Sequence, residues 1–305
     1  MIKRTLGFTT TLLLVLGCSA GGSSGDEGTR VSQPPTLPGT LMPGDSSPTV
    51  APAAPGDRTG AAGLFESEDL EPTDECDGII PVVFRDFSDA HPDFEMDFRG
   101  DGVRLNLVAP SLGSDGKPVF ASSLGCPARQ GTQECRTDYN ANQAVITNAD
   151  SFNQWYRDVP NTNMHFDREL ELIENPNTGV YEFSSGDFFP LAPTDGFGIT
   201  PPGRGKNFLF TTEIHLTFTY IARQRFSFRG DDDLWIFVNG QLALDLGAMH
   251  GVEQGTIDFD AQALELGILP GRDYAMDIFH AERHTDASNF TIETNIACFT
   301  PATVY

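Results

Sequence analysis

Short runs of alternating apolar and polar residues fill the chain from about residue 76 onward. The run EIHLTFTYIA, residues 213–222, places every second side chain on one face of an extended strand, namely Ile214, Leu216, Phe218 and Tyr220. Gly, Pro, Asn and Asp separate further runs, and we expect strands at 78–87, 213–222, 224–228, 234–238, 242–246, 256–260, 274–280 and 290–296. Many short alternating strands with turn residues between them are typical of a β-sandwich or barrel. The pattern therefore predicts an all-β domain.

Two local signals add detail to this domain. Asn239 and Gly240 stand between two apolar runs, and Asn-Gly in that position is a strong signal for a hairpin turn. The segment NADSFNQWYRD, residues 148–158, has a candidate N-cap in Asn148 or Asp150 and aromatic residues at helical spacing. It is the one short helix that we expect.

The first 75 residues have a different character. A basic start and a short apolar stretch at 6–16 fit a secretory signal and not a membrane-spanning helix. The stretch ends in VLGC, which resembles a lipobox, so we interpret residues 1–18 as a lipoprotein signal peptide with lipid attachment at Cys18. Ser19 resembles the sorting pattern of outer-membrane lipoproteins. Residues 19–75 are rich in Gly, Pro, Ser, Thr and Ala, and we expect a disordered tether because so few apolar residues could be buried.

Four cysteines are left once Cys18 is set aside, and an even number in an exported chain favours disulfides. Three pairings are possible. We favour Cys126–Cys135, which closes a short loop, together with Cys76–Cys298, which ties the two ends of the folded region. The formal net charge of −24 argues against nucleic acid as a partner and suits divalent cations.

Six segments, in order, resemble the fibro-slime domain. They are IPVVFRDFSDAHPDFE, GKPVF, FNQWYRDVPNTN, FFPL, FRGDDDLWIFVNGQLALDLGAMHG and HAERHTDASNF, and they span nearly all of residues 79–297. That family is itself similar to the protective-antigen-type β-barrel or sandwich. We therefore assign residues 76–300 to one such domain, followed by a tail at 301–305. The resemblance implies a secreted or surface protein that binds carbohydrate or mediates adhesion, often with calcium, and an association with cellulose attachment or extracellular matrix.

Three consecutive aspartates precede the apolar run at 234–238. In the wider barrel family an aspartate pair lies nine residues ahead of the hairpin glycine, and Asp231 lies nine residues before Gly240. The resemblance implies that a cis peptide turns the carboxylates of Asp231 and Asp232 the same way, so that both bind one calcium ion, a cation that prefers oxygen ligands. It also implies a further ligand from the later loop, where we expect Asn289 first and Asp286 second. The third aspartate, Asp233, falls on the family's usual glycine position, and we expect a turn residue there.

Two alternatives stay open for the aspartates. They could form a plain acidic turn in solvent, or they could act as catalytic acids. Glycoside hydrolysis needs two carboxyl groups about 5–10 Å apart across a sugar, and neighbours in sequence are poorly placed for that chemistry.

Other side chains are weaker candidates for ligand binding. Trp235 could stack on a sugar, although apolar residues on both faces of its run favour a fully packed strand. His250 is expected near the aspartates, as a structural or rim residue. His280, Glu282 and His284 share one face of a strand at period two, so a transition-metal site there is conceivable.

The sequence thus predicts a surface lipoprotein, anchored in the membrane only through its lipid and located at the outer membrane. Its β-domain is expected to bind a polysaccharide or other glycan, with cellulose-like glycans among the candidates, with calcium and without enzymatic activity. The alternatives are a structural matrix protein without a small-molecule site and, less favoured, a glycan-processing enzyme.

Overall fold

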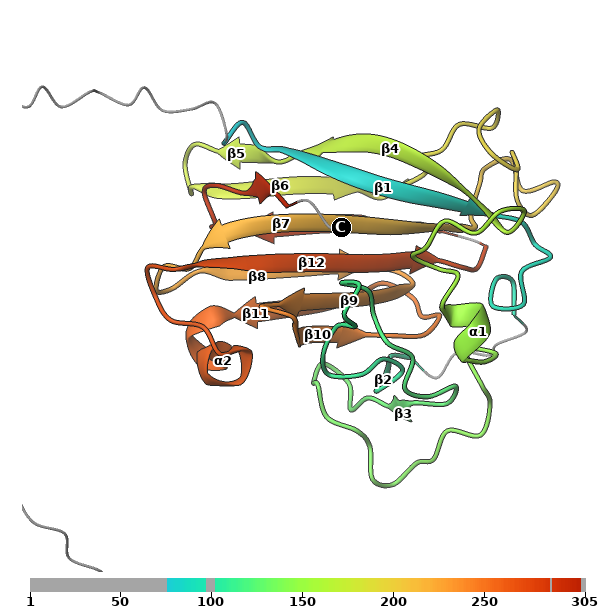
Figure 1. The fold of residues 1–305 in the computed structure, drawn as a ribbon, viewed down its shortest axis with the longest axis horizontal. Coiled ribbons are helices and arrows are strands. Elements are labelled where there is room, and N and C mark those ends of the chain that lie inside the picture. The colour runs from blue at the N-terminus through green and yellow to red at the C-terminus, as the bar shows by residue number, and fades with distance from the viewer. Residues whose placement is uncertain (1–75, 97–101, 286, 303–305) are drawn as a thin grey trace, which may run out of the picture. The chain divides into compact units, whose positions relative to one another are not determined.

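The domain that begins at Cys76 is a sandwich of two antiparallel sheets (Figure 1). The structure is a computed structural model and describes residues 76–96, 102–285 and 287–302. The predicted signal peptide, Cys18 and the predicted tether lie outside the described residues. The strands are β1 (Ile79–Phe87), β2 (Arg104–Leu105), β3 (Cys126–Pro127), β4 (Asn163–Glu171), β5 (Ile173–Asn175), β6 (Val180–Ser185), β7 (Phe210–Thr219), β8 (Arg225–Gly230), β9 (Asp233–Val238), β10 (Gln241–Leu246), β11 (Glu253–Asp258), β12 (Asp273–Glu282), β13 (Phe290–Thr294) and β14 (Thr300–Pro301).

The larger sheet has the strand order β10-β9-β12-β7-β1-β4, and β14 pairs with β7. Strand β7 pairs with β12 along its whole length, from Phe210 opposite Glu282 to Thr219 opposite Asp273. The side chains predicted to share one face of β7 are all buried in the core between the two sheets, which confirms the period-two assignment: Ile214, Leu216, Phe218 and Tyr220.

The smaller sheet has the order β11-β8-β13-β6-β5, and β2 pairs with β3 in a separate short ribbon. Neither large sheet closes on itself within the described residues, so the domain is an open sandwich and not a barrel. The chain passes from one sheet to the other between Gly230, the end of β8, and Asp233, the start of β9. Asp231 and Asp232 are therefore the two residues that cross between the layers.

A second core covers part of the outer face of the larger sheet. Residues between β1 and β4, including α1 (Ala149–Phe152), pack aromatic side chains onto β9 and β12 there. All six residues of β9 are buried because this strand has packed side chains on both faces. The aromatic members of this core are Phe87, Phe94, Phe152, Trp155, Tyr156, Phe208, Trp235, Phe237 and Phe279.

The predicted hairpin and disulfides are present. Asn239 and Gly240 have φ angles of 52° and 72°, as a type I′ turn requires, and join β9 to β10. Cys126 bonds to Cys135, and Cys76 bonds to Cys298, so the second disulfide joins the start of β1 to the segment before β14.

The expectation of a single helix is wrong. α1 begins after the Asn148 N-cap but ends at Phe152, well short of residue 158. A second helix, α2 (Phe259–Leu266), follows β11 directly, where the sequence pattern favoured a strand over 256–260. The side chain of Asp258 accepts a hydrogen bond from the third helical residue, and Gly267 ends the helix with φ 65°, so α2 has a cap at each end. No helix in the described part of the chain is long and apolar enough to cross a membrane.

Candidate functional site

The aspartate run lies at the crossing between the two sheets. The peptide bond between Asp231 and Asp232 is cis, as the resemblance implies. Asp231 and Asp232 are each 5% exposed and Asp233 is 0% exposed. The expectation of a plain acidic turn in solvent is therefore wrong, and each carboxylate must be satisfied by groups within the protein.

Asp231 is held by the loop that leads into β13. Its Oδ1 accepts a hydrogen bond from the Asn289 backbone N–H at 2.6 Å, and its Oδ2 accepts one from Asn289 Nδ2 at 2.8 Å. Its carbonyl oxygen accepts from His280 Nε2 at 2.9 Å, and His280 Nδ1 lies 3.0 Å from the Thr212 hydroxyl. Burial lowers the pKa of His280 to about 4, so the imidazole is neutral near pH 7 and holds the Asp231 backbone in place through this hydrogen bond. Asn289 thus lies beside Asp231 as expected, but it contacts the carboxylate through its N–H groups.

Asp232 is bound by backbone N–H groups on both sides. Its Oδ1 accepts from the His250 N–H at 3.1 Å, and its Oδ2 accepts from the Arg283 N–H at 3.2 Å. Burial, against the opposing effect of His250 and with a smaller contribution from the charge of Asp233, raises the pKa of Asp232 to about 7. The His250 ring contacts two backbone carbonyl oxygens, those of Gly251 at 2.7 Å and Leu246 at 3.2 Å, which makes it the structural neighbour that the sequence predicted.

Asp233 has a structural role that the sequence did not reveal. Its Oδ2 forms a fully buried ion pair with Arg283 Nε at 2.6 Å, and its Oδ1 accepts from the Ala248 N–H at 2.7 Å. The same guanidinium donates to the Asp93 and Val145 carbonyl oxygens and lies 4.6 Å from the Trp155 ring centre. Asp233 is therefore a buried anchor between the crossing and the second core, and the expectation of a turn residue is wrong.

Glu282, at the end of β12, adds a third carboxyl group to the aspartate pair. Burial, followed by the like charges on Asp232 and Asp231, raises the pKa of Glu282 well above its usual range. Its buried Oε2 atom and the buried Ser288 hydroxyl in the neighbouring loop make no hydrogen bond of regular geometry among the described residues, although the Ser288 hydroxyl lies close enough to favour the ionised Glu282 carboxylate and to lower its pKa. In the sequence Glu282 belongs only to a period-two metal pattern, and its place beside the aspartates follows from the register of β12 against β9.

These oxygen atoms suit a hard cation in kind. Carboxylates and a hydroxyl are the ligand types that calcium prefers, and a cation would satisfy the buried Glu282 Oε2 and Ser288 Oγ atoms more fully than they satisfy each other. In the part of the chain that the structure describes, no group of three or more His, Cys, Asp or Glu side chains is arranged so that it could hold a metal ion. The remaining predicted ligand, Asp286, lies outside the described residues.

Two weaker candidates are not placed to bind a ligand. Trp235 is 0% exposed, and its Nε1 donates to Asp245 at 3.0 Å, so neither face of the indole is open to a sugar and the packed-strand alternative applies. His284 is exposed, but its Nδ1 lies 3.0 Å from the Thr285 carbonyl oxygen and it does not join the buried His280 in a metal site. The period-two alignment failed because β12 ends at Glu282.

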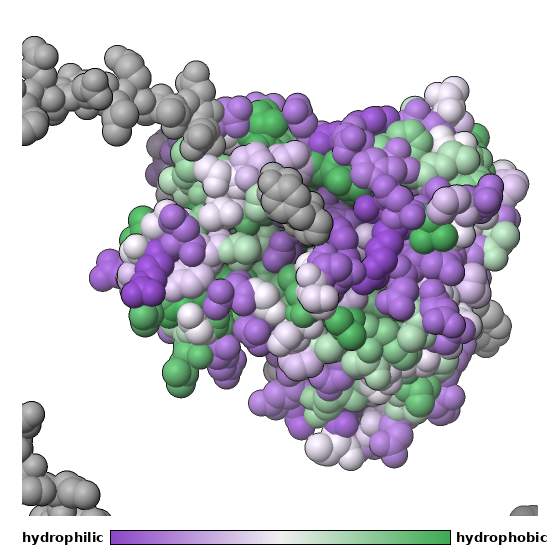
Figure 2. Space-filling view, in the orientation of Figure 1, coloured by the Kyte–Doolittle hydropathy of each residue, from purple (hydrophilic) through white to green (hydrophobic). Residues whose placement is uncertain are grey.

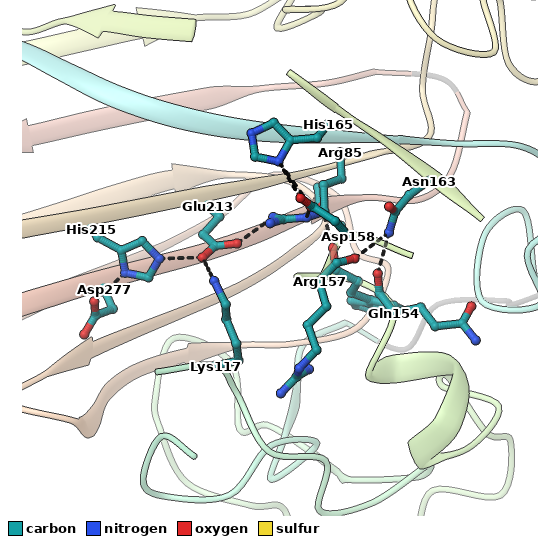
Figure 3. Close-up of polar contacts among 12 residues, drawn as sticks. Arg85, Lys117, Gln154, Arg157, Asp158, Asn163, His165, Glu213, His215 and Asp277 are labelled. Carbon is teal, nitrogen blue, oxygen red and sulfur yellow. Dashed lines mark hydrogen bonds and ion pairs between the residues drawn. The ribbon is translucent and has the colours of Figure 1, made fainter. Parts of the chain in front are cut away.

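A second group of charges, which the sequence did not predict, runs across the outer face of the larger sheet (Figure 3). We call it the cross-strand ion network, and its members are Arg85, Lys117, Asp158, His165, Glu213, His215 and Asp277. Arg85 bridges Asp158 at 2.8 Å and Glu213 at 2.6 Å, and Lys117 also pairs with Glu213. His215 lies between Glu213 and Asp277 at 2.5 and 2.6 Å. The space-filling view shows strongly hydrophilic residues gathered on the same face of the molecule (Figure 2).

Ionisation in the network follows from these contacts. Burial opposes the charge on Glu213, but the hydrogen bond from His215 and the charges on Arg85 and Lys117 outweigh it and lower the pKa of Glu213 to about 2. Burial likewise opposes protonation of His215, and the hydrogen bonds to Asp277 and Glu213 raise its pKa. Because Lys117 and Asp158 come from the segment between β1 and β4, the network fastens that segment to the sheet.

Comparisons with solved structures give weak likenesses. A PA14 sugar-binding domain from an RTX adhesin matches 29% of this chain and 47% of its own length, with 16% identity and a TM-score of 0.21. The PA14 domain of the antifreeze protein MpAFP matches 30% of this chain and 44% of its own, with 14% identity and a TM-score of 0.22. An anti-sigma factor domain-containing protein matches 75% and 79% of the two chains, with 10% identity and a TM-score of 0.22.

Sequence comparison gives stronger similarity, although no family model matches the chain. Protein psiR of Dictyostelium discoideum is 32% identical over 232 residues, which are 71% of this chain and 21% of psiR. Protein psiD of the same organism is 32% identical over 226 residues, 72% of this chain and 41% of its own. Protein psiJ is 32% identical over 238 residues, 72% and 31% respectively. The chain is therefore similar to the Dictyostelium psi proteins over about 70% of its length, while it spans less than half of each of these three relatives.

Proposed function

We propose that the chain is a non-enzymatic surface adhesion protein that binds carbohydrate through a calcium ion at the crossing between its sheets. The observation that carries this proposal is the burial of three carboxyl groups at the crossing, Asp231, Asp232 and Glu282, whose charges act on one another, beside the buried Ser288 hydroxyl. Like charges this close are costly unless they are protonated or share a cation. The resemblance to the fibro-slime domain independently favours the cation.

Asp231 and Asp232 would hold the ion, with further oxygens from Glu282 and Ser288. Asn289 fixes the orientation of Asp231, and it remains a predicted ligand together with Asp286. When bound, calcium neutralises the carboxylates and offers open coordination positions to neighbouring sugar hydroxyls. The backbone N–H groups of His250, Arg283 and Asn289, which donate to these two carboxylates, keep both in place before the sugar binds.

A binding role is favoured over glycan cleavage by the way the carboxylates are held. Asp231 and Asp232 are adjacent in sequence and share one side of the crossing, whereas hydrolysis needs two groups on opposite sides of a glycosidic bond. Display at the cell surface belongs to the same proposal and rests on the lipobox at Cys18, with the lipid as the sole membrane attachment.

A retention assay with and without a chelator tests the function. The purified full chain is applied to a glycan array and to microcrystalline cellulose in calcium, then in excess EGTA. We expect retention on at least one glycan that EGTA removes and added calcium restores. Retention that EGTA leaves unchanged contradicts the calcium bridge, and no retention on any glycan favours the structural matrix alternative. Release of soluble sugar would instead favour the enzyme.

Matched variants locate the effect. Asp232→Asn keeps the shape of the side chain and should abolish retention. The control is Asp273→Asn, an exposed aspartate at the opposite end of β12 from Glu282, which should retain glycan like the wild type. Equal retention by the two variants would reject the assignment of the site to Asp232.

A further inference from the structure

A polar groove lies beside the crossing and has no part in the calcium site. It has a cavity volume of about 940 Å³, near the upper end of the range of about 300–1,000 Å³ that is common for ligand sites. We call it the disulfide-loop groove, because the loop closed by Cys126–Cys135 forms one wall and β11 forms the other. It is lined mainly by residues 128–133, Arg136, Asp138, Leu244, Leu246 and 253–256.

The walls of the groove are polar and its floor is apolar. Gln130 and Thr132 are exposed on the loop side, and Gln254 and Thr256 are exposed on the β11 side. Buried Leu244 lies at the floor. Most small-molecule pockets are largely apolar, so walls of amide and hydroxyl groups favour a ligand that is rich in hydroxyls.

The depth of the groove depends on a glycine. A Cβ atom on Gly255 would lie 2.4 Å from Leu244 Cδ1, which is closer than real contacts allow. Glycine therefore lets β11 pass close over the floor. Its neighbours Gln254 and Thr256 point to the opposite face of the strand, where Thr256 Oγ1 lies 2.8 Å from Ser227 Oγ, so they border the groove at its rim.

The β11 wall also offers unpaired backbone groups. Asp231 N donates to the Asn289 carbonyl on the β13 side, and backbone groups alternate in direction along an antiparallel strand. The backbone N–H and C=O of Phe228, three residues earlier, therefore point toward β11, where the partner of Phe228 is Gly255. Gln254 and Thr256, on either side of Gly255, turn their backbone N–H and C=O groups away from β8, toward the open edge of the sheet. Among the described residues, no hydrogen bond to these four groups occurs.

The neighbouring edge of β10 is covered by the fold. The Leu242 N–H donates to the Pro110 carbonyl at 2.8 Å, and the Asp245 N–H and C=O both bond to the Gln133 side chain, at 2.8 and 3.0 Å. Sheet edges are usually protected in this way. The same contacts hold the loop of Gln133 in place, together with its disulfide, so the loop wall is formed in advance while the β11 wall keeps its hydrogen-bonding capacity.

The groove begins next to the aspartate pair. Glu253, its first β11 residue, is paired with Gly230, the residue immediately before Asp231. On the other side, His250, whose N–H holds Asp232, lies only three residues before Glu253 in the chain. A linear ligand that reaches the crossing can therefore continue along β11.

Both arginines that line the groove are paired with carboxylates, and Glu253 adds a further negative charge. Arg136 lies 3.1 Å from Asp138, and Arg129 lies 3.9 Å from Glu134. With its cations matched by carboxylates, the groove favours a neutral ligand over an acidic one. We propose, on the basis of the function above, that the disulfide-loop groove binds successive units of a neutral linear glucan whose end reaches the ion at Asp231–Asp232.

Calorimetric titration with cello-oligosaccharides of two to six glucose units, in calcium, tests this inference on the full chain. We expect affinity to rise on the order of tenfold from the shortest to the longest probe as more units enter the groove. In the double variant Gln130→Ala with Gln254→Ala the gain should disappear, while calcium affinity stays at the wild-type value. Asn177→Ala, in the turn between β5 and β6 at the opposite edge of the same sheet, is the control and should keep the gain.

Hydrogen exchange gives a second readout at the proposed contact. The longest oligosaccharide should slow amide exchange at Gln254 and Thr256. Affinity that is independent of length, or a double variant that behaves like the wild type, overturns the groove assignment. Protection of these amides by an unstructured peptide, but not by the glucan, overturns it in favour of strand addition. If chelator-sensitive retention on other glycans persists, the proposed function stands without the groove; if no glycan is retained, both fail.

Discussion

Replacing Glu213 by Gln should weaken the attachment of the second core to the larger sheet. Glu213 is 2% exposed in its side chain and pairs with Arg85, Lys117 and His215. The variant keeps the size of the side chain but removes its charge, so Arg85 and Lys117 lose their shared anion and His215 loses a charged hydrogen-bond partner. Breaking a buried ion pair in this way typically costs about 3–5 kcal/mol.

The pKa of Glu213 gives a second route to the magnitude. Lowering it from the usual 4.5 to about 2 corresponds to about 3 kcal/mol of preference for the ionised form, at about 1.4 kcal/mol per pH unit. Urea unfolding at pH 7 with disulfides intact should therefore show a loss of about 3 kcal/mol in the free energy of unfolding. The control Glu169→Gln, an exposed glutamate on β4, should change it by less than about 0.5 kcal/mol.

The pH dependence of the free energy of unfolding tests the role of the network. Because the pKa of Glu213 is lowered in the folded state, its contribution is fully present above pH 4.5 and is lost as pH falls toward 2. His215 has a raised pKa, so its contribution is present below pH 6.5 and is lost as pH rises through the folded-state pKa. The wild type should lose stability on both sides of this window. A Glu213→Gln variant with the wild-type stability and the same acid limb would refute the role given to the network.

Two further substitutions test the surroundings of the crossing. Gly230→Ala should destabilise the fold by about 3 kcal/mol and weaken calcium binding, because a Cβ there would lie 2.4 Å from the Asn289 carbonyl oxygen. Urea unfolding and calcium titration measure both effects, and the control is Gly251→Ala, where no atom lies within 4 Å of the added Cβ. Arg283→Met should cost about 3–5 kcal/mol by leaving Asp233 unpaired, and adding Asp233→Leu should recover part of that loss in the same unfolding assay. An additive double variant would contradict the ion pair.

Local patterns predicted the parts of the fold that depend on local chemistry. The Asn239–Gly240 turn follows from the φ angles that these residues tolerate, and the buried face of β7 follows from period two. The aspartate pair was found because its spacing from the turn glycine lies within one stretch of chain. The α2 helix is not predicted because Phe259 and Asp260 continue the alternating apolar and polar pattern of β11, which hides the N-cap at Asp258.

Contacts between distant segments explain what the sequence could not give. Glu282 joins Asp232 only because β12 pairs with β9, some fifty residues earlier in the chain. Asp233 looked like a turn residue because its partner, Arg283, lies at the end of β12. Trp235 suggests sugar stacking from its sequence context alone, but the segment between β1 and β4 covers the outer face of its strand.

Calcium titration of the full chain by calorimetry is the most direct test of the central claim. We predict one site with a dissociation constant of about 10⁻⁴ to 10⁻³ M, the range of extracellular calcium modules. The site should be lost in Asp231→Asn with Asp232→Asn and unchanged in Asp273→Asn, while the cooperative unfolding of all three proteins is preserved. Absence of binding in the wild type, or an undiminished site in the double variant, would contradict the assignment of calcium to the crossing.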